Sequence, residues 1–177
     1  MDKKEFGLFA SALRTFYPKE NILPNEQAAK LWYSQLQDIP YEIAEVVLNK
    51  WVAINKWSPS ISEIRQQAAQ LTLGELKDWG EAWETVMYAI RHYGSYQVQE
   101  ALDSFDPATK KAVDGLGGFL KLCQTESDKM HVERANFRDL YNQAIEREKE
   151  RAQLPPRVKE LMATMPLMLE EGAKNEE

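Results

Sequence analysis

Residues 49–68, NKWVAINKWSPSISEIRQQA, carry two tryptophans six positions apart, with a Ser-Pro-Ser break directly behind the second. The apolar spacing before the break predicts one helix, and Ser60 with Glu63 forms the Ser-x-x-Glu pattern that caps another. The stretch therefore predicts a corner between two helices. Trp51 falls on the apolar stripe and is expected in the core. For Trp57, at the corner, packing is favoured and partial exposure stays open.

Helical signals continue on both sides of this corner. Asp2 and Asn25 are expected to cap two earlier helices, and Pro40 suits the first turn of the helix that contains Trp51. The inner faces of these helices are expected to include Leu31, Ile54 and Leu71. Residues 1–73 therefore predict a small helical unit.

The second half of the chain also carries helix signals. Gly74 marks a linker or tight turn, Asp78 and Asp106 are expected caps, and a long helix is predicted over residues 128–152. Alternating runs bounded by hairpin turns are absent from the sequence. The predicted fold is all-α: two small packed helical units, 1–73 and 78–152, followed by a flexible tail, 153–177, that is first amphipathic and then disordered.

The 177 residues carry a net charge of -6, with no strongly basic segment and with five basic against nine acidic residues over 74–127. This balance makes direct DNA binding an unfavoured function, since phosphate contacts need clustered Lys and Arg. The lone Cys123 and the lack of a signal peptide or membrane span predict a cytoplasmic protein without direct membrane contact.

Residues with reactive side chains form no recognised catalytic pattern. The run GLGG at 115–118 lacks the Lys and Ser/Thr of a phosphate loop, and His92 and His131 have no metal-ligand spacing. Cys123 has no adjacent base and is expected to be a buried thiol. We therefore expect a binding protein rather than an enzyme, with no cofactor and no metal.

Three groups of residues are candidates for partner binding. Trp57 is the first. The second is Arg134, Arg138 and Tyr141, spaced i, i+4 and i+7, although an ion-paired exposed helix side is the favoured interpretation there. The third is an amphipathic segment of the tail that either meets a partner groove or folds back on the bundle; its members are Val158, Leu161, Met162 and Met165, with Leu154 and Met168 at its ends.

Residues 13–64 resemble a known family in three ordered motifs: FYP (Phe16, Tyr17, Pro18), an LW pair followed by L-x-D-x-P-Y (Leu31, Trp32, Leu36, Asp38, Pro40, Tyr41), and W-x-P-S-I-x-E-I (Trp57, Pro59, Ser60, Ile61, Glu63, Ile64). In order and spacing they look like the N-terminal domain of the phage-encoded loaders and inhibitors of replicative helicase, from phages and prophages of low-GC Gram-positive bacteria.

The resemblance implies a helical adaptor that binds the hexameric replicative helicase in its nucleotide-bound state. Such proteins restrain the ATPase and unwinding of the helicase and deliver it to an origin-bound phage initiator. In that family the helicase contact is attributed to the flexible C-terminal part. For this chain the resemblance therefore implies a contact region near the C-terminus, without defined residues. The second helical unit departs from the shorter family members.

A helical DNA-binding replication or regulatory module is the alternative. The corner at Trp57 would then be a helix-turn-helix bend, with residues 61–70 as the reading helix. That helix offers one basic residue, Arg65, beside Gln66, Gln67 and Gln70.

Overall fold

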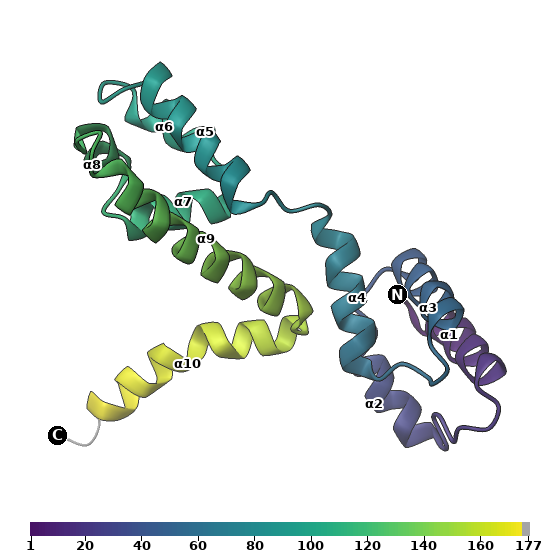
Figure 1. Cartoon of the computed structure of the whole chain (residues 1–177). Coiled ribbons are helices and arrows are strands. Elements are labelled where there is room, and N and C mark those ends of the chain that lie inside the picture. Colours follow the sequence, from purple (N-terminus) through teal and green to yellow (C-terminus); the bar gives the residue numbers. More distant parts are fainter. Residues whose placement is uncertain (175–177) are drawn as a thin grey trace. The chain divides into compact units, whose positions relative to one another are not determined.

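The computed structural model describes the backbone of residues 1–174 and the side chains of residues 1–165. The all-α prediction is confirmed: the described residues form ten helices and no strand. The helices, labelled in Figure 1, are α1 (Lys3–Phe16), α2 (Glu26–Leu36), α3 (Tyr41–Ile54), α4 (Ile61–Leu73), α5 (Trp79–His92), α6 (Val98–Asp103), α7 (Pro107–Gly115), α8 (Phe119–Gln124), α9 (Met130–Gln153) and α10 (Pro156–Lys174).

The chain divides into two compact units. The first is Met1–Gly74 together with Arg151–Glu177, and the second is Glu75–Glu150. The last residues of α9 thus group with the N-terminal helices, whereas the sequence suggested that they belong to the second unit.

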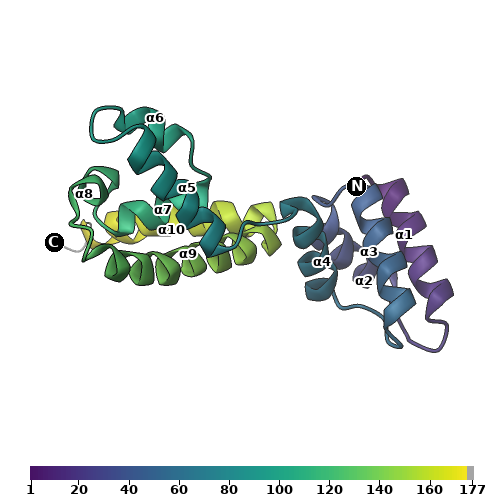
Figure 2. The same ribbon diagram turned by 45° about the horizontal axis from the view of Figure 1, so that its top comes forward.

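Helix α3 is at the centre of the first unit. It packs on α4 and on α1, which lies beside it in both views (Figure 1, Figure 2). The fully buried side chains of this core are Leu13, Leu36, Ala44 and Ile64, and Phe9 and Val47 are almost as well covered. These residues recur at helical spacing, so the packing follows from the apolar stripes of the sequence.

Helix starts follow the local sequence closely. Asp2, Ser60 and Asp78 each form a capping box with the glutamate three residues further on. Asn25 and Asp106 accept hydrogen bonds from backbone amides of the first turn that have no partner inside the helix. All five caps match the sequence predictions.

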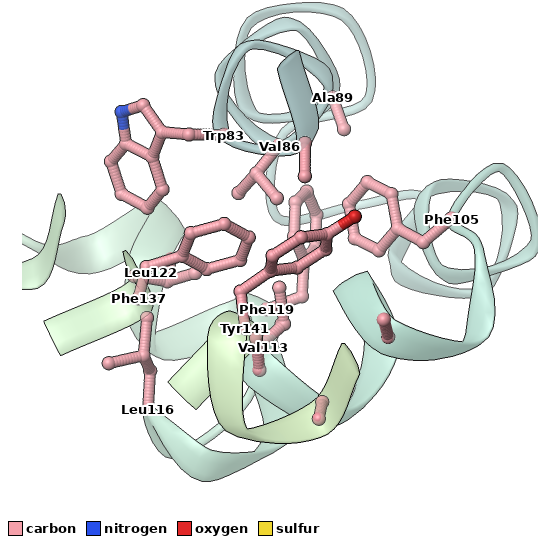
Figure 3. Packing of buried hydrophobic residues seen from close by; sticks show 14 of the residues in the cluster. Trp83, Val86, Ala89, Phe105, Val113, Leu116, Phe119, Leu122, Phe137 and Tyr141 are labelled. Carbon is pink, nitrogen blue, oxygen red and sulfur yellow. The ribbon is translucent and has the colours of Figure 1, made fainter. Parts of the chain in front are cut away.

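The second unit has an aromatic core contributed by α5, α8 and α9, and α7 adds small and aliphatic side chains. Trp83, Phe119, Phe137 and Tyr141 meet in this core, with Phe105 at its edge (Figure 3). The rings of Trp83 and Phe137 lie 5.1 Å apart, and those of Phe137 and Tyr141 lie 5.7 Å apart. Aromatic pairs at such distances add to the stabilisation that comes from the buried area.

Glycines set the close approach of α7 and α9. A Cβ at Gly115 would lie 3.0 Å from the side chain of Leu140, closer than two carbons normally pack. Gly117 has a φ of +98°, which only glycine adopts without strain. The GLGG run is thus used in packing and turning the chain.

A buried arginine joins several segments of the first unit. Arg65 on α4 is 6% exposed. Its Nη1 and Nη2 donate to the two carboxylate oxygens of Asp38, both at 2.8 Å. The same guanidinium donates to the carbonyl oxygens of Gln35, near the end of α2, and of Gln153, the last residue of α9. The positive charge therefore faces a carboxylate and the negative ends of two helices.

Some residues expected to be buried are exposed. Ile54 is 72% exposed, Leu31 58% and Leu71 43%. Ile54 ends α3 and Leu71 lies in the last turn of α4, where the neighbouring helices no longer cover the stripe. The disordered polar end predicted for the tail falls on residues that lack described side chains or, at 175–177, lie outside the described chain.

We expect the Arg65→Ala substitution to lower the free energy of unfolding by about 3 kcal/mol. The change leaves the carboxylate of Asp38 and two carbonyl oxygens without their donor. Urea denaturation at pH 7 measures the loss. Arg147→Ala, on an exposed position of α9, is the control and should change stability by less than about 0.5 kcal/mol. Equal effects of the two substitutions would contradict the role of Arg65.

We also expect a pH effect at Asp38. Burial alone raises the pKa of this carboxyl, but the hydrogen bonds and charge of Arg65 outweigh it, so the pKa is lowered. Stability from such a group is present above its unfolded pKa and is lost as the pH falls through the folded pKa, here below about pH 4. Asp38→Asn should therefore be less stable at pH 7 and should flatten the acid limb of the stability curve. Glu45→Gln, at an exposed position, should leave that limb unchanged.

Candidate protein-docking site

The corner between α3 and α4 displays two large apolar side chains. Trp57 is 66% exposed and Ile54, three residues before it, is 72% exposed. The favoured prediction that Trp57 packs into the core is therefore wrong, and the alternative of an exposed side chain holds. Trp51 is partly buried against the core, as the sequence predicted.

Side chains from α3 and from the segment after α1 hold the peptide group that follows Trp57. The indole Nε1 of Trp51 donates to the carbonyl oxygen of Trp57 at 2.8 Å. The carboxylate of Glu20 accepts from the backbone amide of Ser58 at 3.0 Å and from its hydroxyl at 2.5 Å. The corner is thus bonded to α3 on one side and to the segment after α1 on the other.

The residues after Trp57 are equally constrained. Pro59 is buried, and the backbone amide of Ser60 donates to the carboxylate of Glu63 at 2.7 Å. This bond and the one from the Ser60 hydroxyl lower the pKa of Glu63. A loop held by this many bonds presents its exposed side chain in one position, and a partner that binds it loses little conformational entropy.

One cation lies against the exposed indole. The ammonium group of Lys56 lies 5.2 Å from the centroid of the Trp57 ring, within cation–π range. The carboxylate of Glu20 is bound to Ser58, the next residue of the chain. An apolar anchor with a cation against it is complementary to an apolar pocket with a carboxylate at its edge.

Most motif residues used for the family resemblance serve the fold. Tyr17, Leu36 and Ile64 are buried. Asp38 pairs with Arg65, and Ser60 and Glu63 cap α4. Three large apolar motif residues have exposed side chains: Trp57 at 66%, Leu31 at 58% and Phe16 at 45%. Trp57 is the largest of them, and the peptide group that follows it is held by the fold.

The second candidate group, Arg134, Arg138 and Tyr141, contains two exposed residues and one buried residue. Arg134 and Arg138 are exposed, and their guanidinium carbons lie 5.3 Å and 5.9 Å from the Trp79 ring centroid. Tyr141 is 2% exposed, and its hydroxyl donates to the carbonyl oxygen of Lys77 at 2.9 Å. Burial, followed by nearby carboxylates, raises its pKa to about 12. Tyr141 is therefore a core residue and not a contact residue, because the helix turns it into the aromatic cluster.

The third group lies on α10. Val158 is partly buried, whereas Leu161 is 50% exposed, Met162 58% and Met165 54%. The amphipathic segment thus begins against the first unit and then leaves its apolar side chains in solvent. Met168 lies outside the residues whose side chains are described.

Sequence reasoning missed three members of these surfaces. Ile54 was assigned to the core because its position continues the apolar stripe of α3. Trp79 meets Arg134 across two helices, so the sequence carried no signal for that contact. Lys56 is the chain neighbour of Trp57, and its local contact was overlooked. Among the described residues, no group of three His, Cys, Asp or Glu side chains could hold a metal, and no helix is long and apolar enough to cross a membrane.

We expect Glu20→Ala to loosen the corner without unfolding the unit. Ser58 loses both hydrogen bonds to the carboxylate, at a cost of about 1 to 2 kcal/mol. Amide hydrogen exchange should show faster exchange at Ser58 in this variant, while the amides of α1 keep their protection. Glu42→Ala, at an exposed position of α3, is the matched control. Unchanged protection of Ser58 would show that Glu20 does not brace the corner.

Comparison with known proteins gives one match. Residues 1–65 match the family model for the N-terminal domain of the helicase loader and inhibitor of phage SPP1. No curated protein and no solved structure matches the chain significantly. The match ends within α4 and includes the corner, the pair of Arg65 with Asp38 and every motif quoted from the sequence. The resemblance found in the motifs is thus confirmed: residues 1–65 of this chain are similar to the N-terminal domain of the phage SPP1 helicase loader and inhibitor.

Proposed function

We propose that this chain is a phage DNA-replication adaptor that acts in the cytoplasm of a bacterial host. It binds the hexameric replicative helicase, restrains its ATPase and unwinding, and delivers it to an origin-bound initiator. The observation that carries the proposal is the family match over residues 1–65, combined with the braced corner that displays Trp57 within that region.

An adaptor of this kind acts by differential binding. A protein that hydrolyses no nucleotide itself can hold a motor in one state only by binding that state more tightly than the others. To move a population from mostly one state to mostly the other takes a difference of about 5 kcal/mol. Contact surfaces that are rigid and apolar supply such differences, because they fit one arrangement of the partner and clash with another.

Trp57 has the properties of an anchor residue in a protein interface. Large aromatic side chains that become buried on association dominate interface energies, and each contributes about 2 to 4 kcal/mol. The indole is displayed by a backbone that is already fixed, so its burial carries a small entropic cost. Lys56 beside it favours a partner surface with an acidic residue at the edge of the pocket.

The exposed side chains of α10 are a second contact surface. Leu161, Met162 and Met165 form a flexible apolar group. Methionine adapts to irregular surfaces, which suits a partner that changes shape during its nucleotide cycle. The family resemblance assigns helicase contact to the C-terminal part, and this group supports that assignment here.

The alternative, a DNA-reading module, has less support. In a helix-turn-helix the N-terminal residues of the second helix carry donors to the bases and phosphates. Arg65 is the one basic residue of α4, and its guanidinium is buried against Asp38. The outward positions Gln66 and Gln70 are neutral. No positive charge on α4 is therefore left for phosphate contact.

We expect the full chain to bind a hexameric replicative helicase from a low-GC Gram-positive bacterium and to lower its ATPase turnover. Binding should depend on nucleotide, and it can be measured by biolayer interferometry without nucleotide, with ADP and with a non-hydrolysable ATP analogue. The absence of association under all three conditions would contradict the proposed function.

The role of the corner is tested separately. Trp57→Ala should weaken helicase binding by about thirtyfold, which corresponds to about 2 kcal/mol. The stability of this variant should stay near that of the parent, since the side chain is mostly exposed. The control is Tyr96→Ala, which removes an aromatic ring that is 97% exposed in the second unit. If the parent binds and both variants bind equally well, the function stands and the corner is not the contact.

A further inference from the structure

A face of the second unit gathers arginines around aromatic rings. It is formed by α5 and α9, and we define the arginine–aromatic face by Trp79, Tyr88, Arg91, Arg134 and Arg138. This unit lies outside the family match, which ends at residue 65. The face therefore concerns a part of the chain to which the proposed function gives no task.

The rings and cations of this face are held in position. Arg134 and Arg138 both lie over the Trp79 ring. Tyr88 is 60% exposed and stacks on His92, with ring centroids 5.3 Å apart and an interplanar angle of 15°. Guanidinium groups placed on an aromatic ring keep N–H donors at the edge that can bind an acceptor. Arg138 uses its Nε to donate to the carboxylate of Asp139 at 3.2 Å, so Arg134 is the cation over Trp79 that we consider for ligand binding.

A hollow of about 500 Å³ lies beside these side chains. It is lined by Trp83, Glu84, Met87, Tyr88, Arg91 and Arg134. Glu84 is the acidic group at this hollow, yet no ion pair within 4.0 Å joins it to Arg91 or Arg134 among the described residues. Two cations and one carboxylate thus line the hollow together with an indole, a phenol ring and a thioether.

We propose that the arginine–aromatic face binds an acidic peptide segment of a protein partner, one that carries an apolar side chain among its carboxylates. The carboxylates pair with the guanidinium groups of Arg91 and Arg134. The apolar side chain enters the hollow against Met87 and Trp83. Planar guanidinium groups suit this task because they bind carboxylates through two parallel hydrogen bonds.

The observations favour a peptide over single-stranded nucleic acid. Nucleic acid needs a track of cations along its phosphates and open ring faces on which bases stack. The face offers three cations, Arg91, Arg134 and Arg138, too few to follow a phosphate backbone over several nucleotides. The Trp79 face is covered by arginines and one face of Tyr88 is covered by His92.

Fluorescence anisotropy on the full chain tests the proposal. The probe is a fluorescein-labelled peptide of glutamates followed by phenylalanines. Comparison probes are the same peptide with glutamine in place of glutamate and an oligothymidylate of equal length. We expect binding of the acidic peptide that weakens with salt, and much weaker binding of the two comparison probes.

Substitutions locate the site. Arg134→Ala and Arg91→Ala should each weaken binding of the acidic peptide by about tenfold, the loss expected for one charge-assisted pair. Arg134→Lys, which keeps the charge and loses the planar fork, should fall between. Arg147→Ala, on the same helix but away from the face, is the charge-matched control and should bind like the parent. Circular dichroism checks that each variant keeps its helices.

Several results would overturn the proposal. One is the absence of acidic-peptide binding by the full chain, and another is equal binding of the glutamine peptide. Equal losses in Arg134→Ala and Arg147→Ala would show a nonspecific charge effect. Tighter binding of the oligothymidylate than of the peptide would assign the face to nucleic acid instead. None of these outcomes depends on helicase binding, so the proposal and the proposed function fail independently.

Discussion

The first unit depends on the hydrogen bonds that the guanidinium group of Arg65 donates to surrounding acceptors. This group is buried on α4 and is paired with Asp38, the carbonyl oxygen of Gln35 and the carbonyl oxygen of Gln153. A buried charge is stable only when its donors are satisfied, so the helix ends that supply these acceptors are fixed in place. This pairing positions α4 against the end of α2, and the start of α4 in turn defines the corner at Trp57. The same burial takes away the one cation with which α4 could have met DNA.

Within residues 1–65, most motif residues build the fold, and the exposed side chain of Trp57 is available to a partner. Buried motif residues and caps build the frame, and Glu20 and Trp51 fix the backbone of the corner through bonds to Ser58 and Trp57. The frame leaves a large indole in solvent, although burial of that indole would stabilise the chain. A side chain that is displayed in this way by a rigid backbone is suited to burial against a protein partner.

The sequence predicted best what depends on neighbours in the chain. The caps at Asp2, Ser60 and Asp78 and the helices that follow them were predicted because a cap is a local hydrogen bond. Tyr141 was assigned to a contact face because α9 mixes polar and apolar residues with weak periodicity, and only the packing of α7 and α8 shows which side is covered. Arg65 looked like a surface cation, since its three acceptors come from segments far apart in the sequence. The prediction that Ile54 is buried was wrong for a related reason. The apolar stripe of α3 continues beyond the point where the neighbouring helices cover it.

The central claim, that the braced corner is a docking surface for a larger protein, is tested most directly by amide hydrogen exchange of the full chain with and without saturating helicase. Protection should appear at residues 54–58, which adjoin the exposed indole, while the buried amides of α1 and α3 keep the exchange rates of the free chain. A complex that forms with full occupancy and leaves residues 54–58 unprotected would contradict the account.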